Sequence, residues 1–166
     1  MVWEYMMAEK YIEINETLSV EDWQKRCQSG ENVSADVNLV GVSMYPLARP
    51  HGDSVRIVPV RRSLVLGDVV MFHTKKGKIV THRVFKLDEN TLQTWGDNCE
   101  KPDPAIPYEY VYGLVTHFHR KGRLIYVDTP AWRLYGRIVR HFAPVRRFYK
   151  KTRSALSRLV KGNKKQ

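Results

Sequence analysis

The 166-residue sequence predicts a mainly β domain, with a short helix before it and a basic helical segment after it. Short runs rich in β-branched and aromatic residues, separated by turn residues, fill the centre of the chain, as in barrels and sandwiches. After Asp128 the spacing of apolar residues changes to that of a helix. We therefore expect an N-terminal helical lead over residues 1–32, a β domain over 33–128 and a basic amphipathic helical tail over 129–166.

The N-terminal lead is expected to contain one short helix. Ser19 is a favourable N-cap and is followed by two acids in the first turn. The helix should run through Trp23 to about Gln28 and stop at Gly30. We expect Trp23 to pack in the core, whereas residues 1–18 show no clear pattern.

The β domain is expected to consist of short antiparallel strands. Residues 53–58 alternate between apolar and polar side chains, as a half-buried strand does. Turn residues at Gly67-Asp68, Lys75–Lys78 and Asp88–Asn90 separate the strands that follow. The expected strands cover residues 37–42, 53–58, 69–72, 79–85, 91–95, 109–118 and 122–127. The first of these leads directly into Ser43.

The tail is expected to begin with an amphipathic helix. Thr129 can cap it, and Pro130 suits its first position because no backbone N–H is needed there. One face should present Trp132, Tyr135, Ile138, Val139 and Phe142. The opposite side carries Arg133, Arg137 and Arg140. Pro144 interrupts, a second and weaker stripe follows at Phe148, Thr152, Ala155 and Leu159, and residues 161–166 should be disordered.

The net charge of +11 is concentrated in the last third of the chain. From Arg120 onward there are 15 Lys/Arg and one acid, whereas residues 1–119 have a net charge of −3. Such a tail suits a polyanion: a membrane surface, nucleic acid or an acidic partner. No apolar run reaches 18 residues, and the early acids do not resemble a secretory signal. We expect a cytoplasmic location, with peripheral attachment to the inner membrane face as an option.

Ser43 stands in the stretch Gly41-Val42-Ser43-Met44-Tyr45-Pro46, at the expected end of a strand. A serine hydroxyl is a weak nucleophile at neutral pH and needs a base beside it, with backbone donors for the oxyanion. A serine on such a turn is exposed and has free N–H groups nearby. Most serines in turns serve the turn alone, so this stretch by itself predicts no chemistry.

Further short motifs follow Ser43. They are Gly52-Asp53, Gly67-Asp68 before a strand, Thr81-His82-Arg83-Val84, Thr94-Trp95-Gly96-Asp97-Asn98, Asp103 and Val111-Tyr112-Gly113-Leu114-Val115. In this order and at these separations the set resembles the signal peptidase I superfamily, over about residues 37–115. The most similar branch is the archaeal and endoplasmic-reticulum one, in which histidine replaces the lysine base of the bacterial enzymes. The resemblance implies a LexA/signal-peptidase-like coiled antiparallel β-sheet barrel and a serine endopeptidase.

The resemblance also implies a role for each matching residue. Ser43 matches the nucleophile, and His82 matches the histidine that takes its proton. Asp103 matches the carboxylate that completes the triad, and Asp97 the other acid, which supports the site or takes the same role. The residues that match the turn, the oxyanion region and the adjoining pocket are Gly41, Met44 and Pro46.

These residue types suit hydrolysis near neutral pH. A neutral imidazole can accept the serine proton and return it to the leaving amine, and a carboxylate on the far ring nitrogen fixes its tautomer. Bacterial members add a side-chain hydroxyl two residues before the nucleophile, where this chain has Gly41. The oxyanion donor is therefore expected to be the Ser43 backbone N–H. Along the strand, Val80 and Val84 share the face of His82. Arg83 points the other way, to a core acid or to solvent.

No cofactor or metal ion is expected. Cys27 and Cys99 lie far apart in sequence and have no metal-ligand spacing. His117 and His119 have ligand spacing on a strand, but no acid or cysteine lies near them in sequence.

The nearest relatives have an N-terminal transmembrane helix before the serine motif, and this chain is expected to lack one. The amphipathic tail can be interpreted in two ways. It is either an interfacial helix on anionic lipid, or a helix whose aromatic residues dock on the β domain. The substrate is expected to be a peptide or protein precursor, cut after a small residue as the resemblance implies.

Two other functions remain open. LexA-type repressors share the fold and cleave themselves, but they use a lysine base and an N-terminal DNA reader. Residues 1–36 are short for such a reader, although the tail could bind nucleic acid without sequence preference. The other function is that of a catalytically silent scaffold. The presence of all four candidate catalytic residues argues against it.

Overall fold

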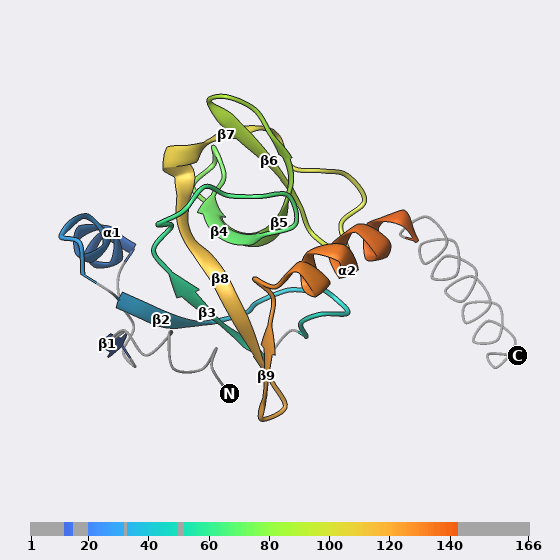
Figure 1. Ribbon diagram of the computed structural model, residues 1–166, viewed down its shortest axis with the longest axis horizontal. Helices are drawn as coiled ribbons and strands as arrows, with labels where there is room; N and C mark the ends of the chain where they lie inside the picture. The colour runs from blue at the N-terminus through green and yellow to red at the C-terminus, as the bar shows by residue number, and fades with distance from the viewer. Residues whose placement is uncertain (1–11, 15–19, 32, 50–51, 143–166) are drawn as a thin grey trace, which may run out of the picture.

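The computed structural model describes residues 12–14, 20–31, 33–49 and 52–142 (Figure 1). They form one curved, nine-stranded sheet with a helix on each side. All neighbouring strands are antiparallel except β1 and β2, which are parallel. The expected mainly β class is confirmed.

The first part of the sheet lies beside the N-terminal helix. It comprises β1 (Ile12–Ile14), β2 (Val33–Asn38) and β3 (Ser54–Val58), with α1 (Val20–Gln28) between β1 and β2. The expected helix and the core position of Trp23 are confirmed. Trp23 is buried, and its Nε1–H donates to Tyr112 O at 2.8 Å. The expected cap, Ser19, lies outside the described residues.

The next four strands form a meander. They are β4 (Val69–His73), β5 (Ile79–Leu87), β6 (Thr91–Trp95) and β7 (Ile106–Pro107). The turns between the first three are those predicted from sequence. β7 was not predicted, because two residues are too few for an alternating pattern to be recognised.

One long strand joins these two parts. After a single 3₁₀ turn at Tyr108–Tyr110, β8 (Val111–Arg120) pairs with β3, with β4 and with β9 (Arg123–Tyr126). The strand order is β1-β2-β3-β8-β4-β5-β6-β7, with β9 as a branch on β8. Among the described strands β1 and β7 are the ends of this order, so the sheet is curved but not closed.

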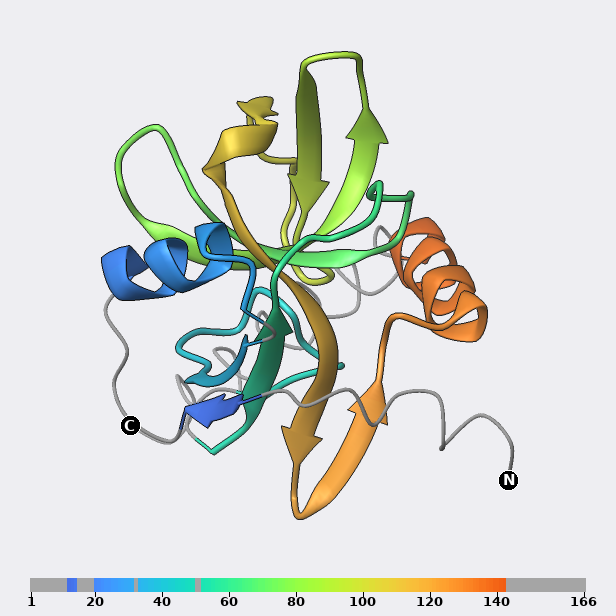
Figure 2. The same ribbon diagram turned by 60° about the vertical axis from the view of Figure 1, so that its left-hand side comes forward.

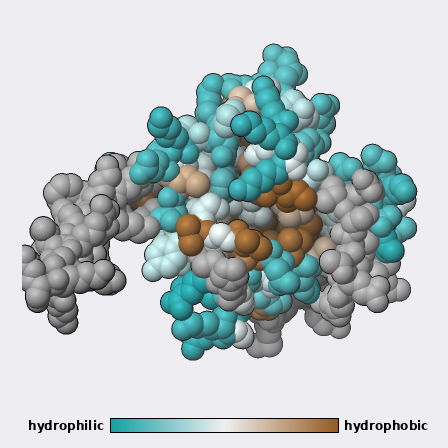
Figure 3. Space-filling model, turned by 180° about the vertical axis from the view of Figure 1, so that it is seen from behind, coloured by the Kyte–Doolittle hydropathy of each residue, from teal (hydrophilic) through white to brown (hydrophobic). Residues whose placement is uncertain are grey.

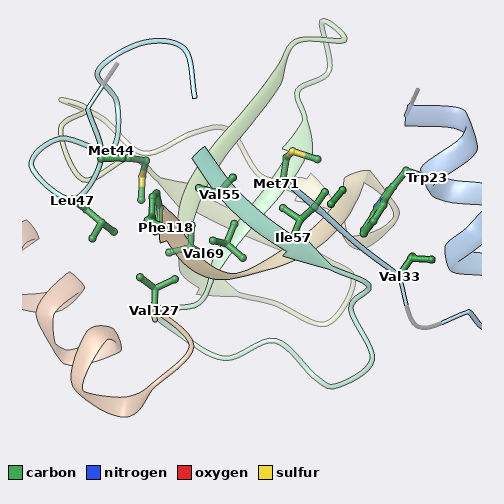
Figure 4. Close-up of a cluster of buried hydrophobic side chains, with 13 residues drawn as sticks. Trp23, Val33, Met44, Leu47, Val55, Ile57, Val69, Met71, Phe118 and Val127 are labelled. Carbon is green, nitrogen blue, oxygen red and sulfur yellow. The ribbon is translucent and has the colours of Figure 1, made fainter. Parts of the chain in front are cut away.

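Two groups of buried side chains form the core. One lies under β4, β5, β6 and β8 and includes Phe72, Val84 and Leu92. The other lies between α1, strands β2, β3, β4 and β8, and the turn after β2 (Figure 4). This second group includes Met44 and Leu47, so the turn that contains Ser43 is anchored in the core.

The expected strand over residues 37–42 is wrong at both ends. β2 begins at Val33 and ends at Asn38, and the chain then leaves the sheet. Gly41 has φ +99°, and Val40 is 85% exposed. Apolar side chains at positions 40 and 42 imitate a buried strand, but they project from a loop.

The tail begins with α2 (Pro130–His141), whose first residue is the predicted one. Trp132 and Tyr135 pack against the core, as one of the two accounts of the tail expected. Ile138 and Phe142 stay out of the core, since both are exposed. The stripe predicted from sequence is therefore buried only in part. The second stripe, Pro144 and the disorder expected for residues 161–166 lie outside the described residues.

The two helices cover opposite sides of the sheet in both ribbon views (Figure 2). α1 packs on β8, with Trp23 in the core. α2 packs beside β5. Neither helix in the described part of the chain combines the length and the apolar character that crossing a bilayer requires.

Candidate active site

The candidate nucleophile stands on the turn between β2 and β3. Met44, Leu47 and Ala48 are buried and fix this turn to the core, whereas Ser43 remains partly exposed. The Tyr45–Pro46 peptide bond is cis. The buried side chains after Ser43 therefore anchor the turn, while the Ser43 hydroxyl stays accessible.

Hydrogen bonds to β8 and to Asp53, the residue before β3, hold the far end of this turn. Arg120 Nη1 donates to the carbonyl oxygens of Pro46 at 2.7 Å and Leu47 at 3.0 Å. The buried carboxylate of Asp53 accepts the backbone N–H of Arg49 at 2.8 Å. Because an arginine can satisfy two carbonyls at once, its position restricts how the turn can move.

Asn98 ties the near end of the turn to the segment after β6. Its backbone N–H donates to Ser43 O at 2.7 Å, and its side-chain amide donates to Val42 O at 3.0 Å. These two bonds fix the backbone on both sides of the Ser43 amide. In the part of the chain that the structure describes, no acceptor is bonded to that amide N–H, so it is available to an oxyanion.

His82 lies in the middle of β5 and is buried. Its Nδ1 lies 2.6 Å from Asp103 Oδ2. The same oxygen accepts the hydroxyl of Thr94 at 2.7 Å, and the Asp103 backbone N–H donates to Thr94 O at 2.8 Å. Asp103 is thus held by β6 in the position that orients the imidazole.

The environment of His82 changes its basicity. Burial by itself lowers the pKa of the imidazole, but the hydrogen bonds to Asp103 and Cys99 and the charge of Asp103 outweigh that effect. The pKa rises from 6.5 to about 9. At neutral pH the imidazole is therefore mostly protonated, and only the deprotonated fraction can act as a base.

The other ring nitrogen of His82 faces a thiol. Cys99 Sγ lies 3.9 Å from His82 Nε2. Gly96 lies beneath both groups, and a Cβ at this position would come within 2.8 Å of Nε2 and 2.7 Å of Sγ. A glycine is therefore required for the histidine and the cysteine to approach the backbone here.

Asp97 is on the other face of the sheet from His82, where it pairs with Arg83. Both side chains are fully buried, with Arg83 Nε and Nη2 at 3.0 and 2.9 Å from the two carboxylate oxygens. Arg83 Nη1 also donates to Gly67 O at 2.9 Å. Of the two alternatives expected for Arg83, a core acid or solvent, the structure shows the core acid. Of the two acids, the structure brings Asp103 to His82, while Asp97 pairs with the neighbouring Arg83.

A cleft of about 580 Å³ unites most of the predicted residues. Gly41, Ser43, Met44, His82 and Asp103 all line it, whereas Asp97 and Pro46 do not. Within the described residues no hydrogen bond joins the Ser43 hydroxyl to His82, so the pair shares the cleft without being directly bonded. In apo sites such bonds are commonly long and tighten only with substrate.

The rest of the cleft is mainly apolar. Its apolar lining consists of Val37, Leu39, Val40, Val42, Met44, Ala48, Met71, Ile79 and Val80. Val40, Val42 and Ile79 are exposed. On the face seen in Figure 3, apolar side chains gather in a band between hydrophilic regions. Exposed apolar surface of this kind is typical of a binding groove.

Sequence reasoning missed the residues that hold the site together. Thr94 and Asn98 stand inside a motif that was recognised, so their proximity could have been inferred. Cys99 directly follows the same motif, so its proximity to His82 could have been inferred too. Arg120 gave no signal, because it reaches the serine turn only through the folding of distant segments.

The pair His117 and His119 lies away from this cleft. Their Nε2 atoms are 3.1 Å apart, and Asp36 lies 3.5 Å from His119. Asp36 is already paired with Arg56 at 2.7 Å. Across the described ranges, no group of three or more His, Cys, Asp or Glu side chains is arranged to hold a metal ion.

Comparisons with known protein families, with curated proteins and with solved structures gave no match.

Proposed function

We propose that the protein is a serine endopeptidase that cleaves a peptide or protein precursor, with Ser43 as nucleophile and His82 as general base. The observation that supports this most is the convergence of Ser43, His82 and Asp103 on one cleft from three separate segments. The finer fold that we propose is the coiled sheet of LexA and signal-peptidase-like enzymes, in agreement with the order of motifs in the sequence.

The proposed reaction begins with neutral His82. Its Nε2 takes the proton of Ser43 Oγ as the oxygen attacks the scissile carbonyl carbon. The resulting oxyanion accepts the Ser43 backbone N–H, which Asn98 holds in place. The imidazolium then returns the proton to the leaving amine as the C–N bond breaks. Water then gives a proton to the same nitrogen and attacks the acyl carbon. The imidazolium returns that proton to Ser43 Oγ as its bond to the acyl group breaks.

Asp103 supports this cycle without carrying the proton. Its carboxylate accepts Nδ1–H, so that Nε2 is the free nitrogen when His82 is neutral. It also stabilises the imidazolium that forms in the first step. Thr94 keeps the carboxylate in place.

The substrate that suits the cleft is an extended peptide with small apolar side chains near the scissile bond. The exposed valines at positions 40 and 42 and Ile79 offer apolar contacts beside Ser43. Cys27 and Cys99 are free thiols, which suits a reducing compartment such as the cytoplasm. The proposed location is therefore cytoplasmic.

A cysteine nucleophile is the second candidate, because Cys99 Sγ lies close to His82 Nε2. In that case Ser43 would serve the turn alone. We favour Ser43, because its amide N–H is free for an oxyanion and its position is fixed from both sides.

The test is cleavage of a peptide library, or of precursor peptides encoded beside the gene, read by mass spectrometry. Ser43→Ala and His82→Ala should each abolish cleavage, whereas Cys99→Ala should retain it. Ser43→Ala and Cys99→Ala should unfold at nearly the temperature of the unmodified protein, whereas His82→Ala loses the contact with Asp103 and should unfold at a lower temperature while remaining folded under assay conditions. Cleavage that survives Ser43→Ala but is lost in Cys99→Ala would replace the serine mechanism by the cysteine one.

A further inference from the structure

The outer face of α2 is apolar although no described part of the chain covers it. Leu134, Ile138 and Phe142 are 55%, 48% and 58% exposed. They are four residues apart, so they form one line along the helix surface. A surface helix normally has polar side chains on its solvent side, so three large apolar side chains in a row there are unusual.

The orientation of α2 that exposes this line is fixed by its inner face. Trp132 and Tyr135 pack in the core, and Arg133 pairs with the buried Asp68 at 3.0 Å. A Cβ on Gly136 would come within 2.3 Å of the Arg83 side chain, so the helix lies directly on that guanidinium. The helix cannot rotate to bury its outer line without losing these contacts.

An exposed arginine flanks the outer line. α2 contains no acid, and Arg137 is exposed beside Leu134 and Ile138. Residues 129–166 together contain 12 Lys/Arg and no Asp or Glu. The described surface therefore combines large exposed apolar side chains with an exposed arginine, on a helix that contains no acid.

We infer that the outer face of α2, defined by Leu134, Ile138 and Phe142, docks on an anionic lipid surface. Interfacial helices bury such a line in the acyl boundary while flanking arginines contact the headgroups. This inference requires none of the chemistry of the candidate active site.

Charge and hydropathy favour lipid over the two other occupants. A nucleic acid would meet Leu, Ile and Phe where phosphate contacts require arginine or lysine. A second copy of the chain, joined through the same face, would set Arg137 against Arg137 and bring no acid from α2. Of these three occupants, an anionic lipid surface is the one that satisfies both the apolar line and the charge.

The docking would also fix the position of the cleft. α2 contacts Arg83, which is adjacent in β5 to His82. A helix bound to lipid through its outer face would therefore keep the candidate active site at a constant distance from the membrane surface.

The experiment is co-sedimentation of the full chain with vesicles of phosphatidylcholine alone and of phosphatidylcholine with about a third phosphatidylglycerol. The unmodified protein should bind the anionic vesicles, and high salt should weaken the binding. The triple variant Leu134→Ser, Ile138→Ser, Phe142→Ser should bind at least about tenfold more weakly, because it loses the buried apolar contacts. The matched control replaces three exposed apolar residues elsewhere, Val60, Val65 and Leu124, by serine and should bind as the unmodified protein does.

A single substitution, Phe142→Ser, keeps the test valid if the triple variant is destabilised, since residue 142 follows the last turn of α2. It should reduce binding to anionic vesicles several-fold. Equal binding of the triple variant and the unmodified protein would overturn the inference, because the basic charge alone would then suffice. Binding to phosphatidylcholine alone at equal strength, dimerisation lost in the triple variant, or preference for duplex DNA over anionic vesicles would overturn it as well.

Discussion

His82 and Asp103 are 21 positions apart in the chain, yet the imidazole Nδ1 and the carboxylate Oδ2 lie 2.6 Å apart. The pair joins the middle of β5 to the segment after β6 at the edge of a cleft that also contains Ser43. This contact sets both the tautomer and the basicity of the candidate general base.

The rate of cleavage should rise with pH. Because the pKa of His82 is about 9, the neutral base becomes abundant only toward that value. The logarithm of kcat/KM is expected to increase up to about pH 9 and then level off. Asp103→Asn should lower the pKa of His82, so the midpoint should move to lower pH while the maximal rate falls by at least about 100-fold.

The control for that profile is Asp88→Asn, which removes an exposed carboxylate paired with Lys86. It should leave the midpoint unchanged. A midpoint near pH 6.5 in the unmodified protein would contradict the raised pKa of His82.

Stability should depend on pH through the same group. The folded-state pKa of His82 lies above the unfolded value of 6.5, so protonation favours the folded state. Its contribution, about 3 kcal/mol, is fully present below pH 6.5 and is lost as pH rises through about 9. Urea unfolding between pH 6 and pH 10 should show this loss, and His82→Gln should show a smaller one.

Arg120→Met should loosen the serine turn. The substitution removes the donors to Pro46 O and Leu47 O while keeping an apolar chain of similar length. The expected cost is about 1–3 kcal/mol of unfolding free energy, with a fall in kcat. Arg123→Met on the exposed β9 is the matched control and should change neither quantity. An Arg120→Met variant with normal kcat would show that the turn holds its position without these two hydrogen bonds.

Gly136→Ala tests the contact between α2 and Arg83. On an exposed helix surface this change stabilises by up to about 1 kcal/mol. Here the added methyl group meets the buried guanidinium, so we expect a loss of about 1–3 kcal/mol instead. Arg137→Ala on the outer side of α2 serves as control in the same thermal unfolding experiment. Stabilisation by Gly136→Ala would mean that α2 does not rest on Arg83.

Cys99 should make the site sensitive to thiol reagents. Its side chain lines the cleft beside His82 Nε2, so alkylation would fill the space that the substrate needs. Iodoacetamide is expected to abolish cleavage by the unmodified protein but not by Cys99→Ala. Cys27, whose pKa is raised by burial, should react more slowly. Inactivation of Cys99→Ala at the same rate would place the sensitive thiol elsewhere.

The sequence allowed the mainly β class, and the candidate residues that share the cleft, to be predicted because both depend on local signals. Alternation and turn residues marked most strands, and the motifs around Ser43, His82 and Asp103 have characteristic spacing. The pairing of Arg83 with an acid could be considered for the same reason, since alternation along β5 places it opposite His82.

Other features could not be predicted from the sequence, because they depend on which surfaces the fold buries. Val40 and Val42 have the pattern of a buried strand, yet they stand on a loop at the cleft. α2 is apolar on two sides, so a helical period alone cannot tell that Trp132 faces the core while Ile138 does not. Arg120 is 74 positions from Pro46, and nothing in the sequence links them.

The central claim is that Ser43 carries the acyl group, and mapping a trapped acyl-enzyme tests it most directly. The protein would be mixed with an activated peptide ester, quenched with acid, digested and analysed by mass spectrometry. We predict an acyl adduct on the peptide that contains Ser43, formed at least about 100-fold more slowly in His82→Ala and absent in Ser43→Ala. An adduct on Cys99, or one on Ser43 that forms equally fast without His82, would contradict the account.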